Sequence, residues 1–561
     1  MPYHALYSSA LMLHFNNLKY KKYENNKINN YIRHVTVVSG GIMTSCSDLL
    51  DLSPIDFYGS GSYWTTEAQV TGYMDGLHKH LRDVAEQHIF TFGELRGGIY
   101  RSGNASDGNA LNYGSIILQN FDRNNTGVTG FGGHYGRLAN INLFIDRVSK
   151  ADYIDDAKKK FYLGQAYGLR AFIYFELYRI YGGVPLRLDV EVIDGVLDPN
   201  KLYMARATPK EVMTQIKKDL DLSMEHFGNV TAFDPYNRGK KVYWSKAATE
   251  CLMGEVYLWT SKVTTGDNEA NIADLAIAKQ HLQSVIDNYG LSMMDNFSDV
   301  FEAKSHKGNN EIIFAIRYLE GEATNRNVNY TYMNQGEIDK GGFREDGTPW
   351  NDPLGLKKSG AQWCEYIPEL FQLFDVEDTR RDATFLASYK KDKDGNLSLW
   401  GTHVQKNIGY INSEGNRVFC GDYAFYRLPW VYLSLAEIAN MESDHSGIEK
   451  YINLVRKRAY ASNWDENKHG YKSGDFTQNE LAILHEKDKE FVQEGQRWWD
   501  VLRMTLTKGG KHLVFCKEAN LKNDGVPILN EATESHKVLW PIEQNMLDKD
   551  PSIKQTPGYD K

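Results

Sequence analysis

One segment, Gly164 to Leu186, constrains the fold of this chain more than any other; it reads GQAYGLRAFIYFELYRIYGGVPL. At helical spacing one face carries Leu169, Phe172, Ile173, Leu177 and Ile180, and a second face carries Gly164, Gly168, Ala171 and Phe175. A helix that is apolar on two faces must lie between other helices. Because glycine costs about 1 kcal/mol relative to alanine inside a helix, we expect Gly164 and Gly168 to let another helix approach closely. A glycine pair ends the helix, and Pro185 imposes an extended exit.

Helical patterns recur along the chain, and some form adjacent pairs. One pair joins a helix with the small residues Ala247, Cys251 and Gly254 to a helix carrying Leu282 and Val285. Short antiparallel pairs with small residues at the contact resemble tetratricopeptide units, although no clean 34-residue period emerges. We predict helices over about 65–88, 134–149, 155–181, 208–227, 243–262, 270–289, 429–442, 447–461 and 478–505, with Thr208 as N-cap and Pro209 at the first helical position of its helix.

Several segments resemble the SusD/RagB family, the surface glycan-binding lipoproteins of Bacteroidetes nutrient-uptake systems. LRAFIYFELYRIYGGVPL closely resembles the signature helix of that family. Other matching segments are YGRLANINLFID, FYRLPWVYLSLAEIANM at 425–441, INLVRKRAY at 452–460, EFVQEGQRWWDVLRM at 490–504 and the ending LWPIEQNMLDKDPSIKQTPGY. The chain departs from the family pattern at Pro429, Glu543, Asp550 and Thr556, which affects local detail and not membership.

The resemblance implies a mainly α fold, in which a tetratricopeptide-like helical array carries a large loop-rich insertion that forms the ligand face. The corresponding divisions are a signal region at 1–45, a lipid anchor and tether at 46–64, an N-terminal helical part at 65–290, a loop-rich excursion at 291–425 and C-terminal helices with a tail at 426–561.

Cys46 follows a short basic segment that includes Lys27 and Arg33, a short apolar segment and two small residues. This is the order of a secretory signal. The end of the segment resembles a bacterial lipobox with Met43 where Leu is usual, which implies that Cys46 is the lipidated first residue of the mature protein. The alternative is a buried strand that ends in Cys. We interpret residues 1 to about 25 as an over-extended gene start or a disordered lead, because signals normally begin near the start Met.

Composition excludes several classes of function. The net charge of -9, with basic residues interleaved among acidic ones, argues against a nucleic-acid partner. The five cysteines show no metal-binding spacing, so neither a metal site nor a disulfide framework is indicated, and no cofactor is expected. Outside the signal region no run of about 18 apolar residues exists, so the mature chain would meet the membrane only through its lipid anchor.

The charged residues of the segment 490–504 lie at i+3 or i+4 spacing on one predicted helix: Glu490, Glu494, Arg497, Asp500 and Arg503. At that spacing opposite charges can pair and anchor neighbouring loops. A glycoside hydrolase would instead need two carboxylates held across a sugar, an arrangement that one helix face rarely supplies. The chain also lacks the HExxH, GxSxG and GxxxxGK[ST] motifs, so we expect a binding protein and no enzyme.

Binding residues are expected where the helical pattern breaks, in 90–133 and 291–425. Both regions are rich in Gly, Asn and Asp, and the second carries aromatic residues among Gly and Pro turns. Aromatic faces pack on the C–H face of a sugar ring, and polar side chains bind its hydroxyls. The predicted stacking residues are Tyr100, Tyr332, Trp350 and Trp363, and the predicted hydroxyl contacts are Arg96, Asn104, Asp107 and Asn334. The alternative for each aromatic ring is that it fills a small core inside its own loop.

The segment DKDGNL at 392–397 begins like a calcium-binding EF-hand loop, with oxygen ligands on Asp392, Asp394 and Asn396. Position 12 of such a loop is His403 in place of Glu. A polar hairpin turn explains the segment better, and no metal site is predicted.

The resemblance therefore implies a lipid-anchored protein on the outer-membrane surface that binds oligosaccharides or polysaccharides. It would deliver them to a SusC-like TonB-dependent transporter for nutrient uptake. Two other functions remain open: a glycoside hydrolase, and a repeat scaffold that binds only protein partners. The sequence does not specify the glycan, since a few loop contacts decide linkage and sugar type.

Overall fold

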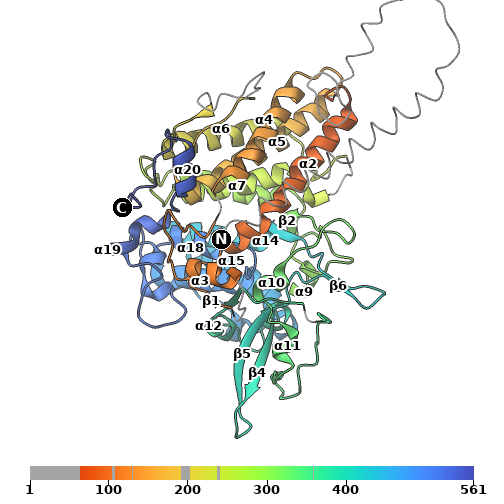
Figure 1. Ribbon diagram of the computed structural model, residues 1–561, viewed down its shortest axis with the longest axis vertical. Coiled ribbons are helices and arrows are strands. Elements are labelled where there is room, and N and C mark those ends of the chain that lie inside the picture. The colour runs from red at the N-terminus through yellow and green to blue at the C-terminus, as the bar shows by residue number, and fades with distance from the viewer. Residues whose placement is uncertain are drawn as a thin grey trace, which may run out of the picture. The chain divides into compact units, whose positions relative to one another are not determined.

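The computed structural model describes residues 63–103, 108–128, 130–190, 202–236, 240–357 and 359–560 (Figure 1). The predicted signal region and the predicted lipidation site Cys46 lie outside these residues. Across the described part of the chain, no helix combines the length and the apolar character needed to cross a membrane.

The long helices confirm the predicted mainly α fold. They are α2 (Glu67–Glu86), α4 (Gly132–Ser149), α5 (Asp156–Tyr181), α6 (Pro209–Phe227), α7 (Lys246–Thr260), α8 (Asp274–Asn288), α14 (Leu428–Glu442), α15 (His445–Tyr460) and α17 (Phe476–Glu490). Each begins within a few residues of its predicted start. At α6, the Thr208 hydroxyl accepts from the Glu211 amide at 3.3 Å and the Glu211 carboxylate accepts from the Thr208 amide at 2.8 Å, which confirms the predicted N-cap.

Shorter elements lie between the long helices. The short α-helices are α3 (Gly108–Ile117), α9 (Phe297–Val300), α10 (Asn327–Thr331), α11 (Gln335–Ile338), α12 (Pro368–Gln372), α13 (Arg380–Thr384), α16 (Glu466–His469), α18 (Arg497–Arg503), α19 (Glu531–Glu534) and α20 (Gln544–Lys549). A π-helical turn, η2 (Gln87–Phe92), continues α2, and the 3-10 turns are η4 (Lys240–Val242), η5 (Ala461–Asn463), η6 (Leu513–Phe515), η7 (Lys517–Ala519) and η8 (Ser535–Val538).

The helix α5 lies among α4, α6 and α7, as its two apolar faces predicted. From Phe161 to Tyr181 every side chain except that of Tyr167 is buried. The sequence predicted that another helix would approach closely at the two glycines, and the close contacts there are instead made by aromatic side chains. A Cβ on Gly164 would lie 3.0 Å from the Phe227 ring, and one on Gly168 would lie 2.0 Å from Nε1 of Trp244. Large rings thus occupy the space that the missing side chains leave.

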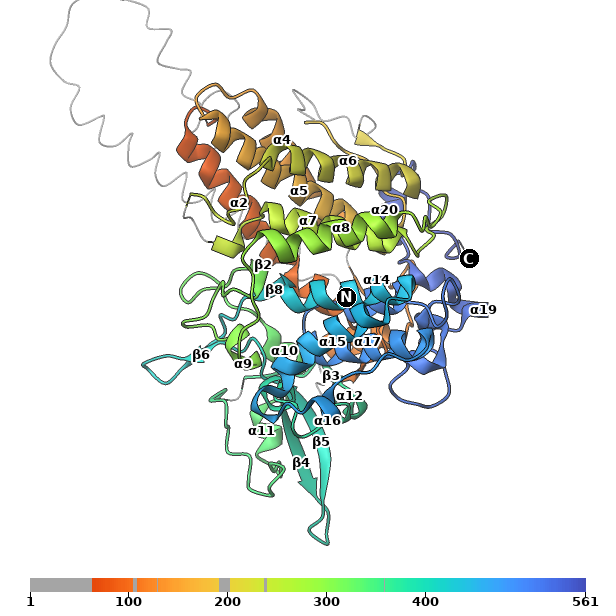
Figure 2. The ribbon, with the colours of Figure 1, turned by 180° about the vertical axis from the view of Figure 1, so that it is seen from behind.

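Successive helices pack in pairs, α4 on α5, α5 on α6 and α7 on α8, which is the arrangement of a tetratricopeptide-like array. The C-terminal helices α14, α15 and α17 form a second group, joined to the first where α14 packs on α8 (Figure 2).

The described strands form four two-stranded antiparallel sheets. They are β1 (Tyr100–Ser102) with β3 (Cys364–Tyr366), β2 (Ile312–Ile316) with β8 (Tyr423–Arg427), β4 (Phe385–Lys391) with β5 (Leu397–Val404), and β6 (Tyr410–Ile411) with β7 (Arg417–Val418). The β4–β5 turn contains the segment 392–397: the Asp392 amide donates to the Asn396 carbonyl at 3.0 Å, and Gly395 has φ 87°. The predicted polar hairpin turn is confirmed.

The prediction of one continuous helix over 478–505 is wrong, because six residues separate α17 from α18. The amides of Glu494 and Gly495 in this break both donate to Oε1 of Glu94, each at 2.9 Å. A Cβ on Gly93 would lie 2.3 Å from the Gly495 carbonyl oxygen, so the two backbones touch directly. The break frees backbone amides that a continuous helix would have used internally, and they enclose a carboxylate from the N-terminal part of the chain.

Candidate functional site

A partly exposed cluster of aromatic rings lies where α3 and α10 meet the strand pair β1–β3 (Figure 1). We call Tyr113, Tyr330 and Trp363 the aromatic platform. The Tyr113 and Trp363 rings are stacked, with centroids 5.8 Å apart and an interplanar angle of 26°, and both are half-buried. Tyr330 is buried beneath them; its ring stacks on Phe90 at 4.0 Å, and its hydroxyl accepts from the Tyr113 hydroxyl at 3.1 Å. The platform therefore presents partly exposed aromatic rings that are supported by buried ones.

Backbone contacts hold Trp363 in place. Its amide donates to the Asn329 carbonyl of α10 at 3.1 Å, and its carbonyl accepts from the Gly103 amide at 3.3 Å. A side chain at position 103 would collide, because a Cβ on Gly103 would lie 1.6 Å from the Gln362 carbonyl oxygen. Tyr113 comes from α3, one turn into a helix that directly follows the loop after β1. The two rings thus come from segments far apart in sequence.

Arg101 supplies a polar group beside the platform. It lies on β1 opposite Glu365 of β3, whose carboxylate accepts from Nε of Arg101 at 2.8 Å. A second guanidinium nitrogen donates to the Trp400 carbonyl at 3.1 Å. The Arg101 side chain is 42% exposed while Glu365 is 1% exposed. The buried carboxylate therefore orients a guanidinium that solvent, or a ligand hydroxyl, can still reach.

Two of the predicted stacking residues, Tyr332 and Trp350, are each 1% exposed, so no ligand can stack on them in this structure. They fill a separate small core, which we call the closed cluster: Tyr332, Met333, Ile338, Trp350, Leu356 and Ile408. Both rings also pack on buried His403, at 4.7 and 5.2 Å. The prediction that they bind ligand is wrong, and the alternative of a core inside the loop is the one observed.

Two further predicted contacts, Arg96 and Tyr100, are also buried, at 0% and 1% exposure. The Arg96 guanidinium lies over the rings of Phe121, Trp498 and Trp540 at 4.8, 4.1 and 4.9 Å, and its Nε donates to Gln119 at 2.8 Å. Burial lowers the pKa of Arg96 to about 9. The Tyr100 hydroxyl donates to Glu94 at 2.9 Å. Both residues make contacts inside the protein, and their predicted role as ligand contacts is wrong.

Trp363 and Asn334 are the predicted residues that remain accessible. Asn334 is exposed, and its Oδ1 accepts from the Gly336 amide at 2.9 Å. The segments that carry Trp363 and Asn334 are hydrogen-bonded to each other, since the Gln362 amide donates to the Tyr332 carbonyl at 3.0 Å. Asn104 and Asp107 lie outside the described residues.

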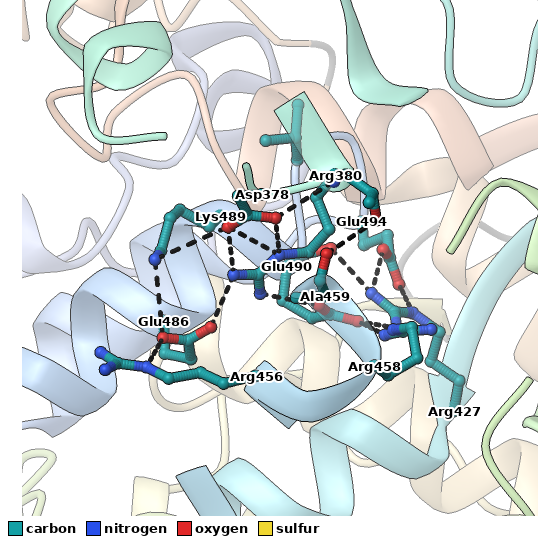
Figure 3. Close-up of polar contacts among 12 residues, drawn as sticks. Asp378, Arg380, Arg427, Arg456, Arg458, Ala459, Glu486, Lys489, Glu490 and Glu494 are labelled. Carbon is teal, nitrogen blue, oxygen red and sulfur yellow. Dashed lines mark hydrogen bonds and ion pairs between the residues drawn. The ribbon is translucent and has the colours of Figure 1, made fainter. Parts of the chain in front are cut away.

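The charged motif residues Glu490 and Glu494 belong to a buried network (Figure 3). The Glu490 carboxylate accepts from Arg427 at 2.5 Å, from Arg380 at 3.0 Å and also from Arg458. Other members of the network are Asp378, Glu311, Lys406, Arg456, Glu486, Lys489 and Glu494. The predicted anchoring role is confirmed: Arg503 pairs with Asp500 one turn earlier at 2.6 Å and with Glu437 of α14 at 2.8 Å.

This network does not have the properties of a catalytic carboxylate pair. Burial alone would raise the pKa of Glu490, but the charges of Arg458, Arg427 and Arg380 outweigh it and hold the pKa well below its ordinary value. The pKa of Glu486 is lowered in the same way by Lys489, Arg380 and Arg456. A general acid for glycoside hydrolysis needs a raised pKa and access to the sugar, and Glu490 has neither.

Within the described residues no group of His, Cys, Asp and Glu is arranged to hold a metal ion. The cysteines Cys251, Cys364, Cys420 and Cys516 are buried free thiols. Burial raises the pKa of the Cys251 thiol well above its ordinary value, so this thiol is a poor nucleophile.

Two family descriptions cover most of the chain. Residues 310–559 match the SusD family, and residues 60–258 match a family described as "Starch-binding associating with outer membrane". A solved SusD superfamily protein from Bacteroides fragilis is 63% identical in sequence, with a TM-score of 0.83 over 89% of this chain and 100% of that chain. This chain belongs to the SusD family.

Other SusD-like proteins are more distant. NanU from B. fragilis is 31% identical, with a TM-score of 0.75 over 91% of this chain and 100% of that chain. The SusD-like protein P2 from Formosa agariphila is 27% identical over 64% of this chain and 68% of its own length. SusD-like proteins bind glycans in association with the outer membrane and are not enzymes, so the family comparison confirms the expected class of binding protein.

Sequence reasoning missed two residues of the candidate site, Tyr113 and Arg101. Successive side chains of a strand face opposite sides, so an inward Tyr100 places Arg101 outward, and that alternation was available in the sequence. Tyr113 lies on α3, a short helix within 90–133, which the sequence predicted to be irregular. Its sequence, GNALNYGSII, contains glycines, and because glycine is a poor helix former the sequence pattern did not predict this helix.

Proposed function

We propose that this SusD family member binds oligosaccharides or polysaccharides at the aromatic platform. The observation that carries the proposal is the stacked, half-buried pair Tyr113 and Trp363 beside the exposed guanidinium of Arg101. Aromatic faces pack well on the C–H surface of a sugar ring, and large rigid side chains lose little entropy on binding. Arg101 is exposed and would donate to sugar hydroxyls, and exposed Asn334 would supply a further hydroxyl contact.

The proposal extends to location and partner. Cys46 would carry the lipid that holds the protein at the outer membrane, and a SusC-like TonB-dependent transporter would receive the glycan. Support comes from the lipobox-like segment before Cys46 and from the outer-membrane association in the matched family description. Co-purification of the transporter with the lipidated protein, and its loss from a Cys46→Ala variant, would test both parts together.

A glycan array probed with residues 47–561 tests the binding function directly. We expect binding to one related group of glycans and its loss in the double variant Tyr113→Ala and Trp363→Ala. The Leu118→Ser variant is a matched control, because Leu118 is 70% exposed on the segment that follows α3. A double variant that stays folded and binds as well as the parent would remove the platform from the site. Release of free sugar by the purified protein would favour the hydrolase alternative instead.

A further inference from the structure

A groove of about 680 Å³ lies between α2 and the strand β2, and none of its lining residues belongs to the aromatic platform. Figure 1 shows where α2 and β2 lie in the fold. Its walls come from one face of α2, from η4 with Tyr243, and from β2 with the residues that follow it. The volume is in the range of pockets that hold small molecules. Neither the sequence patterns nor the matched families assign it a role.

Glycines form the floor of this groove. Gly72 and Gly76 lie one turn apart within α2, and Gly321 lies on the opposite wall. A Cβ on any of the three would meet no atom within 4 Å. Gly321 has φ 77°, a backbone conformation that favours glycine, but neither packing nor backbone conformation requires glycine at positions 72 and 76, where glycine weakens the helix. These glycines leave the backbone along the groove uncovered by side chains, so a ring-shaped ligand can approach it closely.

The side chains of the groove carry both signs of charge. The Glu322 carboxylate is shared by Arg82 at 2.8 Å and Arg317 at 2.9 Å, and the exposed Lys79 and Asp75 lie along the same wall. His78 is occupied within the structure, since its Nε2 accepts from the Trp244 amide at 2.8 Å. A surface that presents donors and acceptors together fits neutral hydroxyl groups, whereas an anion or a nucleic acid would need cations alone.

The helix α2 leads from the groove towards the aromatic platform, because η2 continues this helix to Phe90, on which Tyr330 stacks. Asp75, Lys79, Arg82 and Glu86 lie on one face of this helix, and the rise from Lys79 to Glu86 is about 10 Å. The segment 317–330 follows the same face. It contacts Arg82 through Glu322, and the Arg326 amide donates to Glu86 at 3.1 Å; one turn further, Tyr330 of the platform stacks on Phe90. Glu322, Thr324 and Arg326 are exposed along this path.

We propose that the groove is a second subsite, which binds the continuation of the glycan chain whose first ring stacks on the aromatic platform. The inference rests on the proposed function, because it needs a glycan on the platform. It adds that the protein prefers long chains over short ones of the same sugar. The glycan chain would pass from one subsite to the other along the exposed face of α2 and the segment 317–330.

Filling the groove tests this inference. In the Gly76→Trp variant a large side chain would occupy the floor, and folding should be preserved because the new Cβ meets open space. The matched control is Gly136→Trp, at an exposed glycine of α4 whose Cβ also meets no neighbour within 4 Å. Arg317→Ser is a second variant that removes a groove side chain which is 40% exposed. Melting temperatures equal to the parent's would establish that each variant is folded.

The probes are short and long members of three series: maltotriose and maltoheptaose, xylotriose and xylohexaose, and chitotriose and chitohexaose, measured by calorimetry. For the series that binds, we expect the long member to bind at least fivefold more tightly than the short one. Gly76→Trp and Arg317→Ser should abolish this difference and leave the short member unchanged, while Gly136→Trp changes neither.

A long-chain advantage that survives in folded Gly76→Trp would overturn the subsite, as would equal binding of short and long members by the parent protein. In either case weaker binding of the short member by Trp363→Ala would leave the proposed function standing. Absence of binding by the parent protein to every probe would count against both proposals.

Discussion

The closed cluster around Trp350 and the aromatic platform around Trp363 have similar composition and opposite accessibility. Trp350 is 1% exposed, enclosed by apolar side chains such as Met333 and Leu356. Trp363 is half-buried at the junction with α3 and stacks on Tyr113. An aromatic ring in a Gly- and Pro-rich segment is covered when the segment supplies its own apolar neighbours. It stays open when the segment instead meets a helix whose facing side is partly polar.

The largest effect is expected from Trp350→Ala, which should lower the free energy of unfolding by about 3–5 kcal/mol because it empties a buried site. Urea unfolding followed by circular dichroism measures this change. Glycan affinity of the folded protein should stay within twofold of the parent. A folded Trp350→Ala protein that has lost its ligand would break the distinction between the two clusters.

Trp363→Ala should have the opposite effect, a large loss of glycan affinity with a smaller loss of stability. Removal of a ring from the centre of a binding surface typically costs about 2 kcal/mol of binding free energy, which corresponds to roughly thirtyfold weaker affinity. The free energy of unfolding should change less than for Trp350→Ala, because the ring is only half-buried. Calorimetric titration with the glycan identified by array measures the affinity, and Trp363→Phe, which keeps an aromatic face, should recover most of it.

The two clusters should also differ in their response to pH. Burial raises the pKa of Glu94, beneath the platform, to about 7, although hydrogen bonds from Tyr366, Gly495, Tyr100 and Glu494 act to lower it. Because the folded state holds this proton more tightly than the unfolded state does, the stabilisation is full below about pH 4.5 and is lost as the pH rises towards 7. The parent should therefore lose about 1–2 kcal/mol relative to Glu94→Gln between pH 5.5 and 7.5.

The pH effect expected for His403, on which the rings of the closed cluster pack, has the opposite sign. Burial lowers its pKa to about 3, so its contribution to stability is present above about pH 6.5 and is lost as the pH falls towards 3. Denaturant unfolding of the parent and of Glu94→Gln at several pH values separates the two contributions. A constant difference between the two proteins across this range would show that Glu94 does not titrate there.

The smallest effect is expected at the edge of the platform. Leu111 is 74% exposed on α3, two residues before Tyr113. Leu111→Ser should change the free energy of unfolding by less than about 0.5 kcal/mol, as surface substitutions usually do. Thermal unfolding measures this, and the same variant should bind glycan like the parent. A large loss of affinity would extend the platform along α3.

The long helices were predictable because their apolar spacing, N-caps and terminal glycines all indicate the same structure. Gly168 is one example: the sequence predicted close packing at this glycine, and the Trp244 ring occupies the space where a side chain would lie. The break between α17 and α18 was not predictable from spacing. The segment 491–496 keeps helix-compatible residues, and the carboxylate that holds its amides, Glu94, comes from a distant part of the chain.

The site was harder to predict than the fold, because composition does not report what covers a side chain. Tyr332 and Trp363 both lie in the loop-rich excursion, yet one is enclosed by the closed cluster and the other is reached from solvent. Arg96 is a predicted ligand contact, but it is buried, whereas Arg101 is exposed. Long-range neighbours such as Trp498 and Trp540 decide the burial of Arg96, and no local pattern identifies them.

The contact between Gly93 and Gly495 has a consequence for how this chain can vary. Each of the two family descriptions matches one side of this contact, at 60–258 and at 310–559. Glu94 from the first side accepts from two amides of the second, a Cβ on Gly93 would collide with the Gly495 backbone, and Gly495 has φ 72°, which favours glycine. The two matched segments are therefore expected to be inherited and exchanged together. A chimera that joins halves from different relatives will fold only if both partners keep the same crossing.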